Sequence, residues 1–157
     1  MSGKKWRDLC LLVLLMAAIY IASSMPYTQQ DMRAALARLL DERWLQETFG
    51  WVSFLYGSRE ISIAALGAPG FVEFFLRKGT HFFGFALLAW LLYRVLRYWL
   101  PRQAALPWSG LLAVCAAVLD EWHQTFTPGR TGMVIDVVLD SSGVLFALLL
   151  LCVVNRR

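Results

Sequence analysis

Four long apolar stretches, separated by shorter polar ones, dominate the hydrophobic pattern of the chain. They cover Leu9–Met25, His81–Leu100, Pro107–Thr125 and Val134–Val154. Crossing the roughly 30 Å hydrocarbon core of a bilayer takes about 17–25 helical residues, and each stretch is long enough. The pattern therefore predicts an all-α integral membrane protein with four transmembrane helices, folded as a single domain over residues 1–157.

The segment between the first and second predicted helices, residues 26–80, is too long for a turn and too apolar for disorder. Its periodicity predicts one amphipathic helix over Asp31–Phe49. Two short apolar runs, Trp51–Tyr56 and Ile61–Leu66, follow as re-entrant or interfacial pieces, and Gly67-Ala68-Pro69-Gly70 breaks the chain after them. We expect an amphipathic helical outer segment that either lies on the outer leaflet as a lid or packs against the bundle.

Composition supports the membrane assignment, because 59% of the 157 residues are hydrophobic and the mean hydropathy is +0.55. These values are too high for a typical water-soluble domain. Lys4-Lys5-Trp6-Arg7 before the first apolar stretch also resembles a secretory signal, with Ala22-Ser23-Ser24 as a plausible cleavage site. The length of the apolar stretch favours an uncleaved first transmembrane helix.

The distribution of charge predicts the orientation of the helices. Residues 1–8, 94–106 and 155–157 carry eight of the fifteen basic residues but only one of the eleven acidic residues, Asp8. The eight are Lys4, Lys5, Arg7, Arg94, Arg97, Arg102, Arg156 and Arg157. The positive-inside rule then places both termini in the cytoplasm. The basic residues are thus explained by orientation, and we expect no nucleic-acid binding.

Polar residues gather where the second and fourth predicted helices begin and where the third ends. They form three pairs at helical spacing, Lys78 with His81, Asp120 with Gln124, and Asp136 with Asp140. Residues three or four apart share a helix face. In the predicted orientation these helix ends all face the exterior, so a bundle would bring the pairs together in one outward-facing site. Ionisable residues in membrane segments are usually functional.

Three interpretations of this site stay open. It could bind a polar head group, with Lys78 and Arg130 holding a phosphate or carboxylate and with Asp120, Glu121 and Gln124 taking hydroxyl, amine or amide groups. It could catalyse a reaction, with Glu121 or Asp136 as general base, His81 as acid or base and Arg130 as charge stabiliser. It could also be a structural lock, in which Arg130, held near the acids by a turn at Pro128-Gly129, neutralises two carboxylates.

A metal site is a further alternative at the same position. Asp120, Glu121, Asp136 and Asp140 offer oxygen ligands, and His81 or His123 offers a nitrogen. No dense ligand motif such as H-E-x-x-H is present, and nearby basic residues compete for the carboxylates. The sequence-based expectation is therefore no metal and no cofactor.

The same residues carry a resemblance to a known family. Lys78-x-x-His81-Phe82, then Asp120-Glu121-x-x-Gln124-x-Phe126-x-Pro128-Gly129-Arg130, then Asp136-x-x-x-Asp140-x-x-Gly143 are similar to the VanZ-like family over roughly residues 70–147. The resemblance implies a family signature of Lys78, His81, Asp120, Glu121, Gln124, Arg130 and Asp136. Two positions depart from the family pattern: Phe85 stands where tyrosine is common, and Asp140 stands where asparagine is also common.

The resemblance implies a small multi-pass protein of the bacterial cell membrane, linked to glycopeptide and specifically teicoplanin resistance. Combined with the outward-facing polar site, it predicts binding of a cell-envelope lipid, a peptidoglycan precursor or a lipoglycopeptide such as teicoplanin. The alternatives are an intramembrane enzyme acting on a lipid-linked cell-wall intermediate and a scaffold for another envelope protein. Neither the oligomeric state nor any bond-breaking step follows from the sequence.

Overall fold

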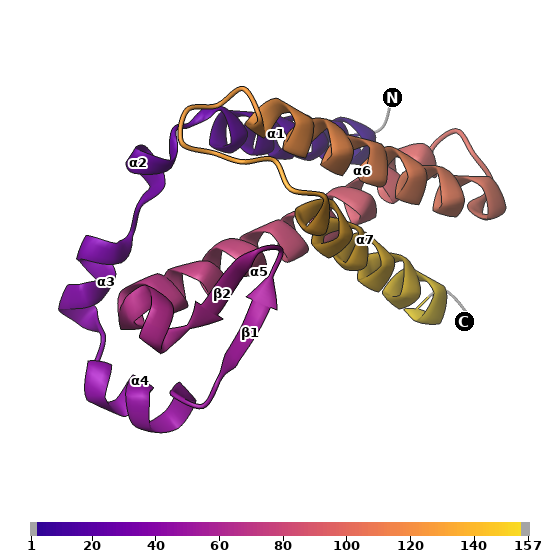
Figure 1. The fold of residues 1–157 in the computed structure, drawn as a ribbon. Helices are drawn as coiled ribbons and strands as arrows, with labels where there is room; N and C mark the ends of the chain where they lie inside the picture. Colours follow the sequence, from indigo (N-terminus) through magenta and orange to yellow (C-terminus); the bar gives the residue numbers. More distant parts are fainter. Residues whose placement is uncertain (1–2, 155–157) are drawn as a thin grey trace. The chain divides into compact units, whose positions relative to one another are not determined.

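The computed structural model describes residues 3–154, which divide into two compact units. The first unit contains residues 3–26 and 81–154, and the second contains residues 27–80. Four long helices dominate the structure (Figure 1): α1 (Gly3–Ser24), α5 (Ile63–Leu96), α6 (Arg102–Gln124) and α7 (Val134–Val154). Arg156 and Arg157, which contribute to the predicted charge asymmetry, lie outside the described residues.

The four long helices meet the length and hydropathy requirements for crossing a membrane. Their outward surfaces are apolar, with large side chains such as Leu14 on α1, Leu119 on α6 and Leu149 on α7 at least half exposed. Such a surface would promote aggregation in water, whereas it suits contact with lipid chains. The predicted all-α membrane fold with four transmembrane helices is confirmed.

Helix α5 begins earlier than the sequence pattern predicts, at Ile63 instead of His81. The predicted break at Gly67–Gly70 is present as a kink, since Gly67 has φ 69° and ψ 161° inside the helix. Pro69 lies two residues later, where the helix restarts, and its lack of a backbone N–H is tolerated at that position. The helix then continues to Leu96, so that His81 lies within a helix that spans both units.

In the first unit, α6 packs against both α7 and α1. The shared core is built from side chains of all four long helices, including Leu12, Phe85, Leu88, Ala117 and Val144. Phe85, the position where the family commonly has tyrosine, is only 2% exposed and lies within this apolar core.

A buried carboxylate joins α1 to α5 at one end of the first unit. Asp8 is only 1% exposed and accepts hydrogen bonds from Arg94 at 3.0 and 3.1 Å and from the Tyr98 hydroxyl at 2.8 Å. The hydrogen bond to Asp8 raises the pKa of Tyr98. A buried carboxylate is tolerated in such surroundings because its charge and lone pairs are satisfied. The sequence pattern identifies Asp8 and Arg94 only as charges that orient the helices and does not predict this contact.

We expect Asp8→Asn and Arg94→Gln each to lower the melting temperature of the protein in detergent. Asp8→Asn removes the carboxylate that Arg94 and Tyr98 bind, and Arg94→Gln leaves the buried Asp8 with the more exposed Arg7 as its remaining cation. The double variant should be no less stable than the worse single variant, since it removes both charges. A thermal-unfolding double-mutant cycle measures this coupling. Lys4→Gln, which removes an exposed charge from the same helix, is the control, and strictly additive effects would contradict the contact.

The second unit contains three short helices and a hairpin before the start of α5. The helices are α2 (Tyr27–Gln30), α3 (Arg33–Leu39) and α4 (Glu42–Phe49). The single helix predicted over Asp31–Phe49 is therefore wrong. The chain breaks at Leu40, whose backbone is extended, and the Asp41 side chain then caps α4 by accepting from the Trp44 amide at 3.0 Å. An aspartate cap of this kind favours a new helix start over continuation.

The second unit contains an antiparallel hairpin, which the sequence pattern did not predict: the first apolar run supplies one strand, and the second run divides between the other strand and the start of α5. Strand β1 (Ser53–Tyr56) pairs with β2 (Arg59–Ser62), and Gly57 at the turn has φ 63°. Ile61 and Phe71 belong to a separate apolar core of this unit. Trp44 and Trp51 stay largely exposed, as tryptophans in a membrane interface do. The predicted contact of this segment with the outer leaflet stays a prediction.

Candidate functional site

Most of the predicted site residues meet in the first unit, where α6 ends and α7 begins. Glu121, Gln124, Asp136 and Asp140 are buried there. Only 17% of the His81 side chain is exposed. His81 comes from α5, and the loop 125–133 closes the site. The structure thus brings together polar residues that the sequence had placed at the ends of different helices.

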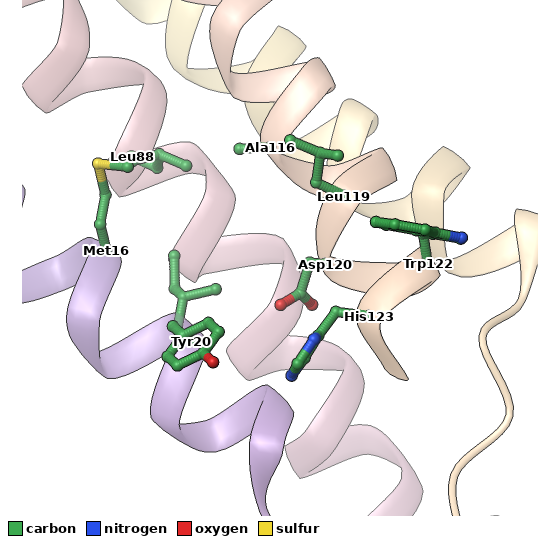
Figure 2. A pocket seen from close by; sticks show the side chains of 9 residues that line it. Met16, Tyr20, Leu88, Ala116, Leu119, Asp120, Trp122 and His123 are labelled. Atoms are coloured by element: carbon green, nitrogen blue, oxygen red, sulfur yellow. The ribbon is translucent and has the colours of Figure 1, made fainter. Parts of the chain in front are cut away.

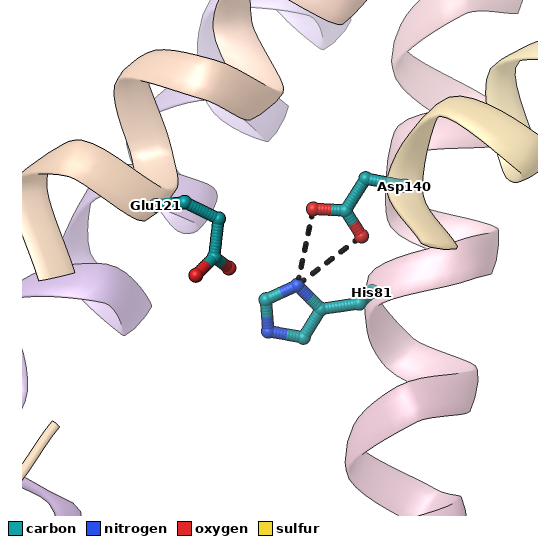
Figure 3. Close-up of side chains that lie close together, drawn as sticks. All are labelled: His81, Glu121 and Asp140. Atoms are coloured by element: carbon teal, nitrogen blue, oxygen red, sulfur yellow. Dashed lines mark hydrogen bonds and ion pairs between the residues drawn. The ribbon is translucent and has the colours of Figure 1, made fainter. Parts of the chain in front are cut away.

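His81, Glu121 and Asp140 form the centre of this cluster (Figure 3). The Nδ1 atom of His81 lies 3.3 Å and 3.4 Å from the two carboxylate oxygens of Asp140. One ligand-type atom from each of the three residues lies within 4.8 Å of the other two. The three side chains therefore point into one small volume.

A network of hydrogen bonds holds Glu121 in place. Its Oε2 atom accepts from the Met133 amide at 3.0 Å, and its Oε1 atom accepts from the Gln124 side chain at 3.2 Å. Gln124 also donates to Asp120 at 2.9 Å. One amide group thus links two carboxylates, and the loop before α7 supplies a main-chain donor.

Arg130 ties the loop to the end of α1. Its guanidinium donates to the carbonyl oxygens of Ala22 and Met25, at 3.0 and 3.2 Å, and to Oε1 of Gln124 at 3.2 Å. The last carbonyls of a helix lack partners within the helix, and a cation there is favourable. The predicted turn at Pro128-Gly129 is confirmed by Gly129 with φ 73° and by a hydrogen bond from the Arg130 amide to Thr127.

Two glycines determine how closely the elements of the site approach. A Cβ atom on Gly143 of α7 would lie 2.1 Å from the main-chain oxygen of Phe82, so α5 and α7 touch there through their backbones. Phe82 follows His81 directly, and Gly143 lies about one turn beyond Asp140. Likewise, a Cβ atom on Gly132 would lie 2.1 Å from the oxygen of Glu121. These contacts set the separations within the cluster.

Beside the cluster, a groove of about 320 Å³ opens between α1, α5 and α6 (Figure 2). Its walls are mainly apolar, and its polar groups are concentrated at Asp120 and His123. The lining residues are Met16, Ile19, Tyr20, Leu88, Ala116, Leu119, Asp120, Trp122 and His123. A long apolar wall with a few polar groups at one place is typical of a ligand site.

His123 was expected from the sequence only as an alternative metal ligand, and in the structure it contacts α1. Its Nε2 atom lies 3.1 Å from the Ser24 hydroxyl, and its ring stacks against Tyr20 with 5.2 Å between centroids. Nothing in the periodicity of α6 identifies the matching side chains of α1. The one available signal was the position of His123 within the polar stretch 120–130.

Lys78 is the predicted site residue that belongs to the second unit. Its ammonium lies 4.7 Å from the centre of the Tyr56 ring and 5.7 Å from that of Phe74. Within that unit a further buried acid, Glu73, pairs with Arg77 at 2.7 Å. The membership of Lys78 in the polar site stays a prediction.

The four apolar helices define a multi-pass membrane protein whose polar side chains converge in the first unit. The family profile described as VanZ/LLP1 matches residues 9–155. The chain belongs to the VanZ/LLP1 family, which confirms the resemblance found in the motifs. It matches no curated protein and no solved structure.

We expect Gly143→Ala to destabilise the protein by roughly 1–3 kcal/mol, because the added methyl group must push α7 away from the α5 backbone. Gly84→Ala is the matched control, since a Cβ atom there has nothing within 4 Å and alanine favours the helix. Thermal unfolding of both variants in one detergent measures the difference. Equal stability of the two variants would contradict the close contact between the helices.

Proposed function

We propose that this VanZ/LLP1-family protein binds a cell-envelope component that combines a hydrocarbon chain with a polar head group. The chain occupies the groove between α1, α5 and α6, and the head group lies against Asp120 and His123. The observation that carries this proposal is the distribution of chemistry in the groove, which is apolar along its length and polar at one place.

The dimensions of the groove support such a ligand. Its volume of about 320 Å³ falls in the range of small-molecule sites. Each methylene group removed from water contributes about 0.8 kcal/mol, so part of a chain held there adds substantially to affinity when the ligand comes from the aqueous phase. Arg130 and Gln124 adjoin Asp120 through a chain of hydrogen bonds and complete a polar rim for phosphate, carboxylate, hydroxyl or amide groups.

The direction in which the site faces also bears on the ligand. The positive-inside pattern predicts that the end of the first unit carrying Glu121 and Arg130 faces the cell exterior. There the protein would meet lipid-linked peptidoglycan precursors and lipoglycopeptides. We therefore propose teicoplanin, which carries an acyl chain, as the representative ligand, and a role of the protein in glycopeptide resistance through this binding.

An intramembrane enzyme is the second candidate. The observation that favours it is the buried cluster of His81, Glu121 and Asp140, because a histidine beside two carboxylates can transfer protons. Its substrate would be a lipid-linked cell-wall intermediate held in the same groove. Chemical change of the bound compound, detected by mass spectrometry, separates this candidate from a binding protein.

Filling the groove should weaken binding without removing any polar group. In Ala116→Phe the new ring lies in the groove, and displacing about two methylene groups of a bound chain costs about 1.6 kcal/mol, or roughly a tenfold loss of affinity. Equilibrium binding of teicoplanin to the protein in nanodiscs measures the effect. The same compound with its acyl chain removed should bind weakly to the original protein and to the variant alike.

Val118→Phe is the matched control, because Val118 is exposed on the same helix and does not line the groove. It should bind teicoplanin as the original protein does. If Ala116→Phe folds and retains full affinity, the chain does not occupy this groove. If acylated and deacylated teicoplanin bind equally well, the hydrocarbon chain has no part in recognition.

A further inference from the structure

The cluster of His81, Glu121 and Asp140 has more acid than its protein partners balance. Asp140 is completely buried and Glu121 is 4% exposed. Within residues 3–154, the hydrogen bonds and ion pairs to these two carboxylates come from His81, the Gln124 side chain and the Met133 amide. None comes from a lysine or an arginine.

One oxygen of Asp140 has no hydrogen-bond donor. The Nδ1 atom of His81 is close to both oxygens, but only its contact with Oδ2 has hydrogen-bond geometry, and Oδ1 is buried without a hydrogen-bond partner. A buried acceptor without a donor costs about 1–3 kcal/mol, and more when it is charged. Oδ1 therefore lies buried where an additional positive group would stabilise it.

Further carboxylates lie nearby. Asp136 is buried on α7, one turn before Asp140, and Asp120 shares the side-chain amide of Gln124 with Glu121. The missing ligand motif and competition from nearby basic residues were the two reasons to expect no metal. The guanidinium of Arg130 donates to the carbonyl oxygens of Ala22 and Met25 and to Gln124. The ligand-type atoms of His81, Glu121 and Asp140 converge in a buried place where α5, α6 and α7 meet.

We propose that His81, Glu121 and Asp140 bind one divalent transition-metal ion, with Zn²⁺ as the best match. One imidazole nitrogen and two carboxylate oxygens form a ligand set that Zn²⁺ accepts. In a tetrahedral site with bonds of about 2.0–2.1 Å, neighbouring ligand atoms lie roughly 3.3 Å apart. The pair formed by His81 and Asp140 already has this spacing at 3.3 Å.

Glu121 must move a short distance to become the third ligand of the ion. Its ligand atom lies within 4.8 Å of the other two, and movement of its side chain brings it into the set. The ion replaces the proton on Nδ1 of His81 and compensates the orphaned oxygen of Asp140. Gln124, which donates to Glu121 at 3.2 Å, orients that ligand from outside the coordination sphere. Three protein ligands leave a fourth position for water.

This cation site is independent of the proposed function, because neither Glu121 nor Asp140 lines the groove. The two proposals also fail separately. If the original protein binds Zn²⁺ but not teicoplanin, only the proposed ligand groove is rejected. If it binds teicoplanin but not Zn²⁺, only the proposed cation site is rejected.

The experiment uses the full chain in detergent, purified without a polyhistidine tag, stripped with a chelator and titrated with Zn²⁺ against a chromophoric competitor. We expect about one tightly bound ion per chain. Mg²⁺ should compete poorly, because it prefers oxygen ligands alone. Alkylation of the three cysteines must leave the binding unchanged, since Cys10, Cys115 and Cys152 are not part of the cluster.

Variants locate the ion within the protein. His81→Ala, Glu121→Gln and Asp140→Asn should each weaken Zn²⁺ binding more than roughly 100-fold, and Gln124→Ala by about 10–100-fold. His123→Ala is the matched control, because His81 and His123 are the two histidines of the chain, and it should bind Zn²⁺ normally. Asp140→Asn retains the size of the side chain and is the variant best suited to fold.

Two results would overturn the proposal. In the first, the stripped original protein takes up neither Zn²⁺ nor Mn²⁺, and its melting temperature does not change with either ion. The cluster is then a hydrogen-bonded contact only. In the second, Zn²⁺ binding persists in Asp140→Asn and His81→Ala but is lost after cysteine alkylation, and the ion then belongs to thiols elsewhere.

Discussion

The cost of placing ionisable groups in hydrocarbon is the constraint on which this structure depends. A charge there must be paired, hydrogen-bonded or kept near the ends of the helices. Asp8 with Arg94 satisfies the condition at one end of the first unit, and His81 with Asp140 satisfies it in part at the other, where one carboxylate oxygen has no donor. His81 and Arg94 lie on one helix, roughly 20 Å apart. Between these polar clusters the core is apolar, and the outer surfaces of the helices suit lipid.

The polar cluster at the His81 end exists because backbones touch. The contact between Gly143 and the oxygen of Phe82 fixes the approach of α7 to α5, and Gly132 allows the loop to close over the end of α6. Arg130 then attaches this loop to the last carbonyls of α1. The same arrangement leaves an apolar groove beside a group of acids. A ligand with a hydrocarbon chain and a polar head group fits this combination of an apolar groove and nearby polar side chains. The proposed function is based on this fit.

The elements that depend on local pattern alone were predictable from the sequence. Hydrophobic stretches identified the four membrane helices. The helical spacing of polar residues on α6 and α7 identified most of the acidic residues that lie together in the polar site. Features that depend on a distant partner were not predictable. The burial of Asp8 requires Arg94, and the groove requires the side chains that α1 brings to His123. The break before Asp41 and the hairpin at Gly57 reflect capping and turn geometry, which hydrophobic periodicity does not encode.

The most direct test of the central claim is an experimental density map of the protein, purified from its own membrane and placed in nanodiscs with teicoplanin. We expect elongated density along the groove, with its polar part beside Asp120 and His123. We also expect the contact between Gly143 and Phe82 to be present. A map in which side chains fill the groove between α1, α5 and α6, with teicoplanin bound elsewhere or not at all, would contradict the proposed binding mode.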